Sequence, residues 1–212
     1  MNKKVGMYSS VITFIAVFAF AVCMLLEILL DNNIGKIGNY FSSIFIAFGF
    51  IPMMCSFFTF VDNQKKSLGL LALSFSIMYG TIVIIVYFTQ LTTVRLSELS
   101  NEIVFLLDYL QFGLFFNYDL LGYMFMALST FFMGIILETK NKQEKLLKRL
   151  LCIHGIFAIS CFTAPILGVF GSSMAGETIT GTILLEIWCI YFMPICILSY
   201  NYFKNIKEVE SY

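Results

Sequence analysis

Two glutamates, Glu27 and Glu186, interrupt long apolar stretches of the sequence. Each is the only charged residue in its stretch, which runs over residues 8–30 or 178–203. A charged side chain inside a membrane is costly, so it usually faces the interior of a helix bundle or a water-filled cavity. An acid held in such a place can bind a cation or carry a proton. Both glutamates are therefore candidate binding residues, and Glu186 lies deeper in its stretch.

Helical spacing aligns further polar residues on the inward faces of the apolar segments, and the strongest polar groups lie near the same end of these segments. The acids would supply negative charge, an arginine would act as counter-ion, and tyrosine, glutamine and threonine would supply hydrogen bonds. The predicted pocket, centred on Glu186, consists of Glu186, Glu27, Asp119, Arg95, Gln90, Tyr87, Tyr123 and Thr182. It suits a small cationic or zwitterionic solute, or a proton. Alternatively, Glu27 and Asp119 reach headgroups and water, and Glu186 is paired within the bundle.

The sequence lacks the residues that catalytic, metal-binding or nucleotide-binding sites would require. A single histidine, His154, cannot supply the paired ligands of a metal-dependent membrane enzyme, and no HExxH, GxSG, P-loop or GxGxxG motif occurs. We therefore expect no catalytic residue, no metal and no cofactor. His154 shares a helix face with small residues such as Ala158, which favours helix packing and a hydrogen bond to a neighbouring helix near the inner surface. A proton relay is the alternative.

The composition shows which solvent surrounds these residues. Of the 212 residues, 59% are apolar and 12% are charged, against about 45–50% and about 25% in soluble domains. A soluble fold of this size cannot hide so much apolar surface, so the solvent is lipid. The formal net charge of zero gives no basic face for nucleic acid. The six cysteines lie in or beside apolar runs without a CxxC pair, which indicates packing residues.

Long runs with few charges predict the elements, since about 20 apolar residues cross the hydrocarbon as a helix. The predicted fold is an all-α polytopic membrane bundle, a single domain of residues 1–212 with six transmembrane helices. Their approximate ranges are 8–30, 37–61, 67–94, 117–138, 147–170 and 178–203. Prolines at 52, 165 and 194 are expected to kink their helices. A cleaved signal peptide ending near Ala21 is less favoured, because the first apolar run continues to Leu30.

The positive charges predict the orientation. With the N-terminus inside, eleven of the 13 Lys and Arg residues fall in inner segments, and only Lys36 and Arg95 fall outside. This asymmetry predicts that both termini are cytoplasmic. The longest outer segment begins a helix at Ser100 to Glu102 and then repeats apolar residues at helical spacing. We expect an amphipathic helix over 100–112 that lies on the outer membrane surface or caps the bundle.

Two segments carry a family resemblance. The first is Tyr87-Phe88-Thr89-Gln90-Leu91-Thr92-Thr93-Val94-Arg95, and the second is Asp119-Leu120-Leu121-Gly122-Tyr123 followed by Met126-Ala127-Leu128-Ser129-Thr130. Together they resemble a group of bacterial six-span membrane proteins that have a YFxQLTxVR segment and a D-L-G-Y…LST segment and no assigned function. The resemblance covers about 30 residues. It implies a protein of the bacterial inner membrane and brings no activity, substrate or site.

Three functions stay open. The first is a transport or solute-binding module with an outward-facing pocket, whose partners are the bilayer and a small cationic or zwitterionic solute. The second is a non-catalytic partner subunit, either of immunity type or a permease half serving a separate ATPase, marked by charge over residues 144–149. The third is a membrane enzyme acting on lipid, which needs Asp119 with Tyr123 or Arg95. Self-association is compatible with each of them.

Overall fold

The computed structural model describes residues 1–30, 33–170 and 179–206, and these ranges contain helices and no strand. Six helical segments in them are long and apolar enough to cross a membrane. The all-α six-helix prediction is therefore confirmed, and the chain is a multi-pass membrane protein. Its helices are α1 (Asn2–Leu30), α2 (Asn33–Thr59), α3 (Lys66–Thr89), α4 (Asn101–Leu107), α5 (Leu114–Ile136), α6 (Lys142–His154), α7 (Ile156–Ile166) and α8 (Ile179–Asn205).

Three shorter turns complete these elements. The 3₁₀ turns η1 (Asn63–Lys65) and η3 (Tyr109–Gln111) precede α3 and α5, and the π-helical turn η2 (Gln90–Val94) prolongs α3. The fifth span consists of α6 and α7, which are separated at Gly155. This interruption lies ten residues before Pro165, which stands in the last turn of α7. Pro52 and Pro194 lie inside the uninterrupted helices α2 and α8.

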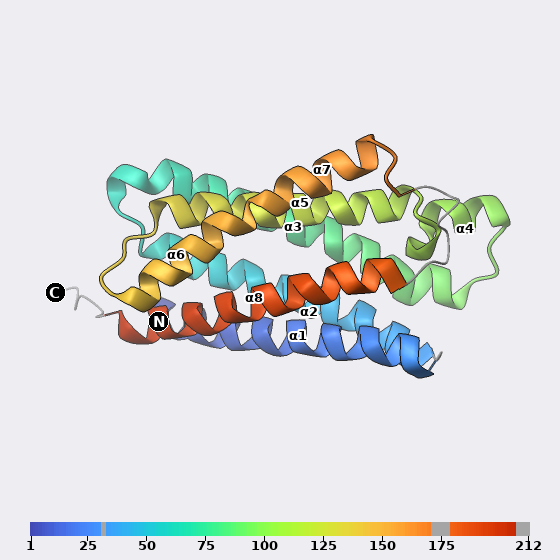
Figure 1. The fold of residues 1–212 in the computed structure, drawn as a ribbon, viewed down its shortest axis with the longest axis horizontal. Coiled ribbons are helices and arrows are strands. Elements are labelled where there is room, and N and C mark those ends of the chain that lie inside the picture. Colours follow the sequence, from blue (N-terminus) through green and yellow to red (C-terminus); the bar gives the residue numbers. More distant parts are fainter. Residues whose placement is uncertain (31–32, 171–178, 207–212) are drawn as a thin grey trace.

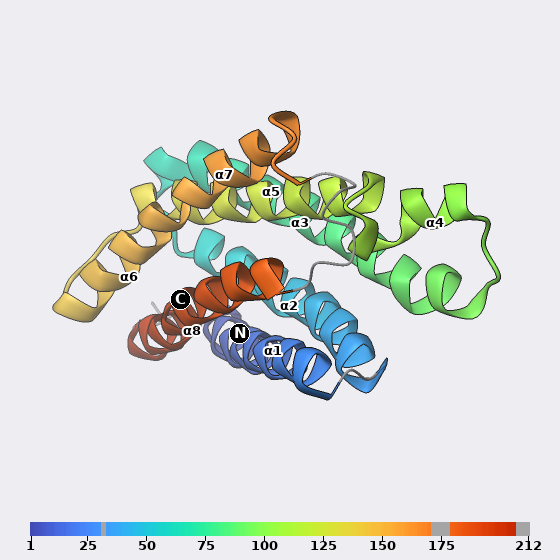
Figure 2. The ribbon, with the colours of Figure 1, turned by 45° about the vertical axis from the view of Figure 1, so that its right-hand side comes forward.

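The two ends of the bundle differ. The first turn of α1 and the last turn of α8 lie together at one end, where Lys3 Nζ donates to the carbonyl oxygen of Ile206 at 3.0 Å (Figure 1). We call this the terminal end. The segment α4 lies beyond the opposite end, which we call the α4 end (Figures 1 and 2). The turns between α2 and α3 and between α5 and α6 also lie at the terminal end.

The spans form two groups. In one group α1 packs on α2 and on α8, and in the other α5 packs on α3, α6 and α7. Contacts of α2 with α3 and of α6 with α8 join them. Helices α1 and α2 approach each other closely because glycines of α2 face α1. A Cβ added at Gly35 would lie 2.6 Å from Glu27 N, and one added at Gly49 would lie 2.8 Å from Thr13 N. Such small residues allow the backbone contact that holds membrane helices together.

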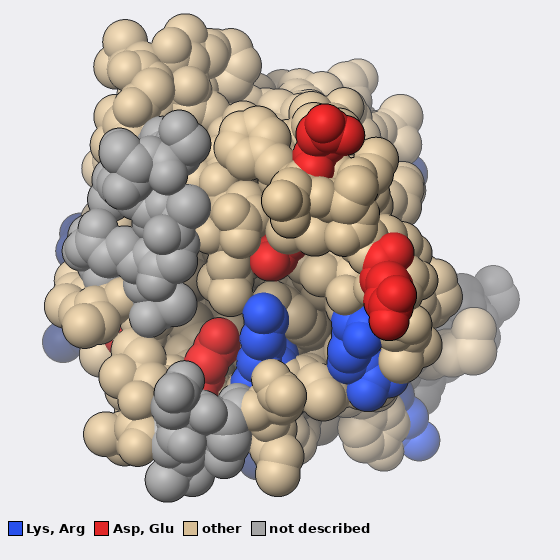
Figure 3. Space-filling model, turned by 90° about the vertical axis from the view of Figure 1, so that its right-hand side faces the viewer, with Lys and Arg blue, Asp and Glu red and all other residues tan. Residues whose placement is uncertain are grey.

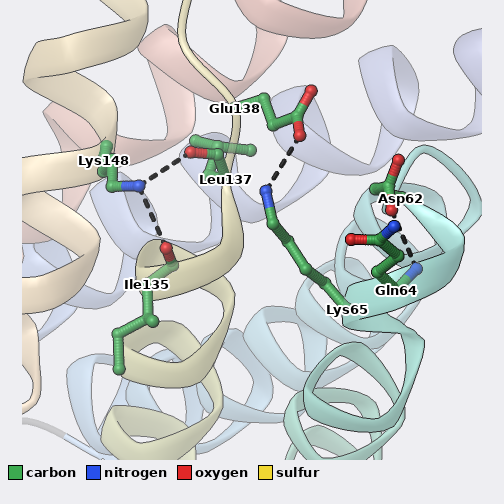
Figure 4. Close-up of polar contacts among 7 residues, drawn as sticks. All are labelled: Asp62, Gln64, Lys65, Ile135, Leu137, Glu138 and Lys148. Carbon is green, nitrogen blue, oxygen red and sulfur yellow. Dashed lines mark hydrogen bonds and ion pairs between the residues drawn. The ribbon is translucent and has the colours of Figure 1, made fainter.

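Polar contacts at the terminal end stabilise the ends of helices (Figure 4). Lys148 Nζ donates to the carbonyl oxygens of Ile135 and Leu137, both at 3.0 Å, at the end of α5. A cation there satisfies carbonyls that have no partner within the helix. Lys65 Nζ pairs with Glu138 at 2.9 Å, but both side chains are exposed, so this pair adds little to stability.

The segment after α3 departs from the single helix expected over 100–112. The α-helix ends at Leu107, Asp108 is extended, and the 3₁₀ turn η3 follows. The reason is local, because the Asp108 carboxylate accepts the N–H of Leu110 at 3.1 Å and so starts a new turn. In α4 no residue is buried, and Ile103 and Leu106 are exposed.

Candidate ligand-binding cavity

Asp119 is the most deeply buried acid at the α4 end. It lies in the second turn of α5 and is 2% exposed. Its Oδ2 accepts a hydrogen bond of 3.2 Å from the Tyr87 hydroxyl of α3. Its Oδ1 is buried and has no partner among the described residues. Buried polar atoms are normally hydrogen-bonded, and each exception requires an explanation. Here the residue that carries the unpaired oxygen lines a cavity.

The cavity has a volume of about 300 Å³ and lies between the two helix groups at the α4 end. This volume is at the lower end of the range of about 300–1,000 Å³ typical of small-molecule sites. Most of the lining is aromatic and aliphatic. The lining comes from α1, α2, α3, η3, α5, α6, α7 and α8, and it includes Phe20, Met24, Phe157, Leu185 and Trp188.

Other polar groups of the lining also lack partners. The hydroxyls of Tyr40 and Tyr123 and the side-chain oxygen Oδ1 of Asn39 are buried without a hydrogen bond among the described residues. Asn39 Nδ2 donates to Glu27 Oε2 at 3.4 Å, so a second carboxylate also borders the cavity. The described part of the lining contains no Lys or Arg. Its two acids are Asp119 and Glu27, and its free atoms are mainly acceptors and hydroxyls.

The roof of the cavity is built by η3 and held by Gln90. The π-helical turn η2 begins at Gln90, whose Nε2 donates to the Leu107 carbonyl at 2.8 Å and whose Oε1 accepts the N–H of Tyr109 at 3.1 Å. Single π turns in helices are frequent at functional sites. The Tyr109 ring lies 5.9 Å from that of Tyr87. Burial raises the pKa of Tyr109, and the nearby Asp119 raises it further, so Tyr109 keeps its proton.

Aromatic rings cover the same end of the cavity. Phe112 adopts the left-handed region (φ 53°), which ends η3 and turns the chain toward α5. Its ring lies 4.6 Å from Phe116 and 6.0 Å from Phe170. On the outer surface of the same α4 end, acidic and basic side chains lie close to one another (Figure 3). Phe112, Phe116 and Phe170 all line the cavity, so Asp119 lies beneath an apolar cover.

His154 forms the floor of the cavity with Trp188. Trp188 Nε1 donates to His154 Nε2 at 3.0 Å, and His154 Nδ1 lies 2.7 Å from Thr130 Oγ1. Since Nε2 accepts, the neutral ring carries its proton on Nδ1 and donates it to Thr130. Thr130 in turn donates to the Ala127 carbonyl at 2.9 Å. Both nitrogens are satisfied, which favours the packing interpretation over a proton relay. His154 lies at the middle of the fifth span, deeper than expected.

Below this floor the bundle is closed. The Trp188 ring stacks at 5.1 Å on Phe192, which lies 6.2 Å from Phe50. Phe50, Phe192 and Met126 are fully buried. These side chains pack closely between the cavity and the terminal end. The cavity therefore belongs to one half of the bundle.

Five of the eight residues predicted for a pocket line this cavity: Glu27, Tyr87, Asp119, Tyr123 and Thr182. The other three do not border it. Gln90 is buried behind the roof, and Arg95 Nε donates to the carbonyl of Leu91 at 3.0 Å. Glu186 is half-buried, and its Oε1 has no hydrogen-bond partner among the described residues. Asp119 thus lines the cavity, whereas Glu186, the predicted centre, does not.

Sequence reasoning missed several lining residues. Tyr40, Asn39 and Tyr109 lie near the ends of helices, and Trp188 lies two residues after Glu186. The signal that could have identified Tyr109 is its place directly after Asp108, a residue type that starts turns. Across residues 1–30, 33–170 and 179–206, no group of three or more His, Cys, Asp and Glu is placed to hold a metal ion.

Comparisons with known proteins give no family. No family model, no curated protein and no solved structure matches the chain. The geometry of the cavity is therefore the basis for any functional conclusion.

Proposed function

We propose that the protein is a membrane module that binds a small organic cation, for uptake or sensing, in the cavity centred on Asp119. The observation that carries the proposal is Asp119 itself, a 2% exposed residue that lines a cavity of about 300 Å³ and whose Oδ1 has no partner among the described residues. A buried carboxylate oxygen without a donor has lost its water without replacement, which is unfavourable. An ammonium group offers N–H donors and positive charge together.

The lining supports a cation that also has an apolar part. Glu27 and Asp119 supply negative charge, and the described lining holds no cationic side chain. Aromatic faces such as those of Tyr87 and Trp188 attract cations through their quadrupoles. The remaining wall is apolar, and it stabilises the carbon skeleton of a ligand by removing it from water.

We also propose that the α4 end faces outward, in a bacterial inner membrane, with both termini in the cytoplasm. In the described ranges the terminal end carries the clusters Lys3–Lys4, Lys65–Lys66 and residues 140–149, whereas the α4 end carries Lys36 and Arg95. Short cytoplasmic loops are rich in Lys and Arg. On a cysteine-free background, a cysteine at Glu98 should react with a membrane-impermeant maleimide in intact cells. One at Lys142 should react only after permeabilisation, and the reverse pattern overturns this orientation.

The two other functions find less support in the contacts. The partner-subunit hypothesis relied on charge over residues 144–149, but Glu144 accepts the N–H₂ of Asn141 at 2.7 Å and Lys148 binds the end of α5. Glu144 thus stabilises the start of its own helix, α6, and Lys148 stabilises the end of α5. The lipid-enzyme hypothesis needed Asp119 beside Tyr123 or Arg95, yet the hydrogen bond to Asp119 comes from Tyr87.

The experiment uses Trp188, the single tryptophan of the chain, which lines the cavity. The full chain in phosphatidylcholine nanodiscs is titrated with phenethylammonium, and Trp188 emission is recorded. The neutral isostere 2-phenylethanol is titrated in parallel. We expect saturable binding of the cation only. Asp119→Asn should weaken it about ten- to a hundredfold, since hydrogen bonds to charged groups contribute about 1.5–3 kcal/mol.

The matched control is Glu102→Gln, which removes an exposed acid of α4 and should leave the titration unchanged. Absence of saturable binding, or equal binding by wild type and Asp119→Asn, would overturn the proposal. Glu186→Gln tests whether the binding site is centred on Asp119, as we propose from the structure, or on Glu186, as the sequence predicted. Binding retained within about twofold favours Asp119, whereas complete loss returns Glu186 to the centre.

A further inference from the structure

The cavity is polarised along the bundle. Its acceptors and hydroxyls come from residues near helix ends at the α4 end, such as Glu27, Tyr40 and Asp119. Its inner wall is apolar, and Trp188 lies nine residues after the start of α8, or about 14 Å along the helix. An amphiphile in the adjacent leaflet has the same order, with its head toward the surface and its chain toward the bilayer centre.

The inner, apolar part of the cavity reaches the outer surface of the bundle. Leu184 and Ile187 of α8 line the cavity and are nonetheless 52% and 55% exposed. Ser160 of α7 also lines it and is exposed. These residues lie where the fifth span and α8 move apart. The first part of that span, α6, packs on α8, whereas its second part, α7, packs on α5 and runs away from α8 (Figures 1 and 2). The mouth therefore lies between α7 and α8.

The surface around this mouth is a lipid-facing one. Ile159 on α7 and Ile183 and Ile190 on α8 are 67%, 56% and 66% exposed. Exposed residues of this kind on spanning helices contact acyl chains. The opening thus faces hydrocarbon in the half of the membrane at the α4 end, and a ligand can reach the cavity without crossing the roof of η3 and Phe112.

Resting on the proposed function, we infer that the ligand is a single-chain amphiphile with a cationic amine head, which enters from the bilayer between α7 and α8. The ammonium group contacts Asp119 and the tyrosine hydroxyls. The chain passes Trp188 and leaves through the mouth lined by Ser160, Leu184 and Ile187. The volume of about 300 Å³ holds one chain and not two. The acidic lining, without Lys or Arg in its described part, repels a phosphate head.

The experiment measures quenching of Trp188 by bromine, which acts only near contact. Dodecylammonium brominated at carbon 4 or at carbon 12 is added to the full chain in phosphatidylcholine nanodiscs. A bromine at carbon 4 should lie in the cavity and quench strongly. One at carbon 12 should lie outside in the bilayer and quench weakly. In Asp119→Asn the strong quenching should disappear, and in Glu102→Gln it should persist.

A second variant keeps the test independent of Asp119. Ser160→Phe narrows the mouth, and we expect it to reduce the affinity for dodecylammonium about tenfold more than the affinity for phenethylammonium. Equal reductions would overturn lateral entry. Equal quenching by brominated dodecanol would overturn the cationic head. Binding of phenethylammonium without any binding of dodecylammonium would overturn the inference and leave the proposed function standing, whereas binding of neither probe would overturn both.

Discussion

The two buried polar residues at opposite ends of the cavity are satisfied to different degrees. His154, at the floor, has both ring nitrogens within hydrogen-bond distance of Trp188 and Thr130. Asp119, near the α4 end, has one oxygen bonded to Tyr87 and one without a described partner. A completed hydrogen-bond set fixes a structure, while an incomplete one leaves room for a ligand. The difference separates a residue that holds the fold from one that serves a ligand.

The largest effect on stability is expected from His154→Ala. This change leaves the Trp188 N–H and the Thr130 hydroxyl with fewer partners and removes a ring that stacks 5.9 Å from Tyr191. Large-to-small changes and lost buried hydrogen bonds together predict a loss of about 3 kcal/mol. Thermal unfolding in detergent measures it. Trp188→Phe, which keeps the aromatic packing, should lose less, and a fully stable His154→Ala would contradict the structural role.

A pair of glycine variants compares a closely packed position of the bundle with an open one at the cavity end. At Gly134 of α5, an added Cβ would meet the backbone N of Cys152 in α6 at 2.9 Å, whereas Gly181, at the start of α8, has nothing within 4 Å. Gly134→Val should destabilise by about 2 kcal/mol through overpacking. Gly181→Ala should be neutral or stabilise by up to about 1 kcal/mol through helix propensity. Equal unfolding midpoints for the two variants would refute the contrast.

A smaller, local effect is expected from Gln90→Leu. The change removes both hydrogen bonds that hold the roof, those to the Leu107 carbonyl and the Tyr109 N–H. Hydrogen exchange of the amides over residues 107–112 should therefore accelerate, while exchange within α5 stays unchanged. Glu102→Gln, on the exposed face of α4, is the control. Unaltered exchange over 107–112 in Gln90→Leu would show that the roof is held by its aromatic contacts alone.

Hydropathy was sufficient for the spans but not for the centre of the site. The uncharged runs predicted all six spanning helices, because lipid requires each span to be continuous and apolar. They also ranked Glu186 above Asp119, since Glu186 lies within its run and Asp119 at the edge of one. Burial of Asp119 depends on its cover by η3 and Phe112, which lie outside its apolar run, and by Phe170, which is distant in sequence. No periodicity within one segment contains that information.

The same limit applies to His154 and to the outer segment. The stripe of small residues predicted a packing face, but the partners Thr130 and Trp188 lie on two other spans. The apolar repeat predicted one helix over 100–112, whereas the Asp108 carboxylate ends it by bonding to Leu110 N. Local hydrogen bonds of Asp side chains compete with helix propensity, and apolar spacing alone does not show them.

The central claim is that Asp119 is left partly unsatisfied for a ligand and not for the fold. Thermal unfolding of wild type and Asp119→Asn, each with and without saturating phenethylammonium, tests it most directly. We predict that the amine raises the wild-type midpoint, because a ligand that binds only the folded state stabilises it. Asp119→Asn should unfold at or above the wild-type midpoint without the amine, since an amide is easier to bury than a carboxylate, and should not respond to the amine. A destabilised Asp119→Asn protein that still shows the full shift would contradict the account.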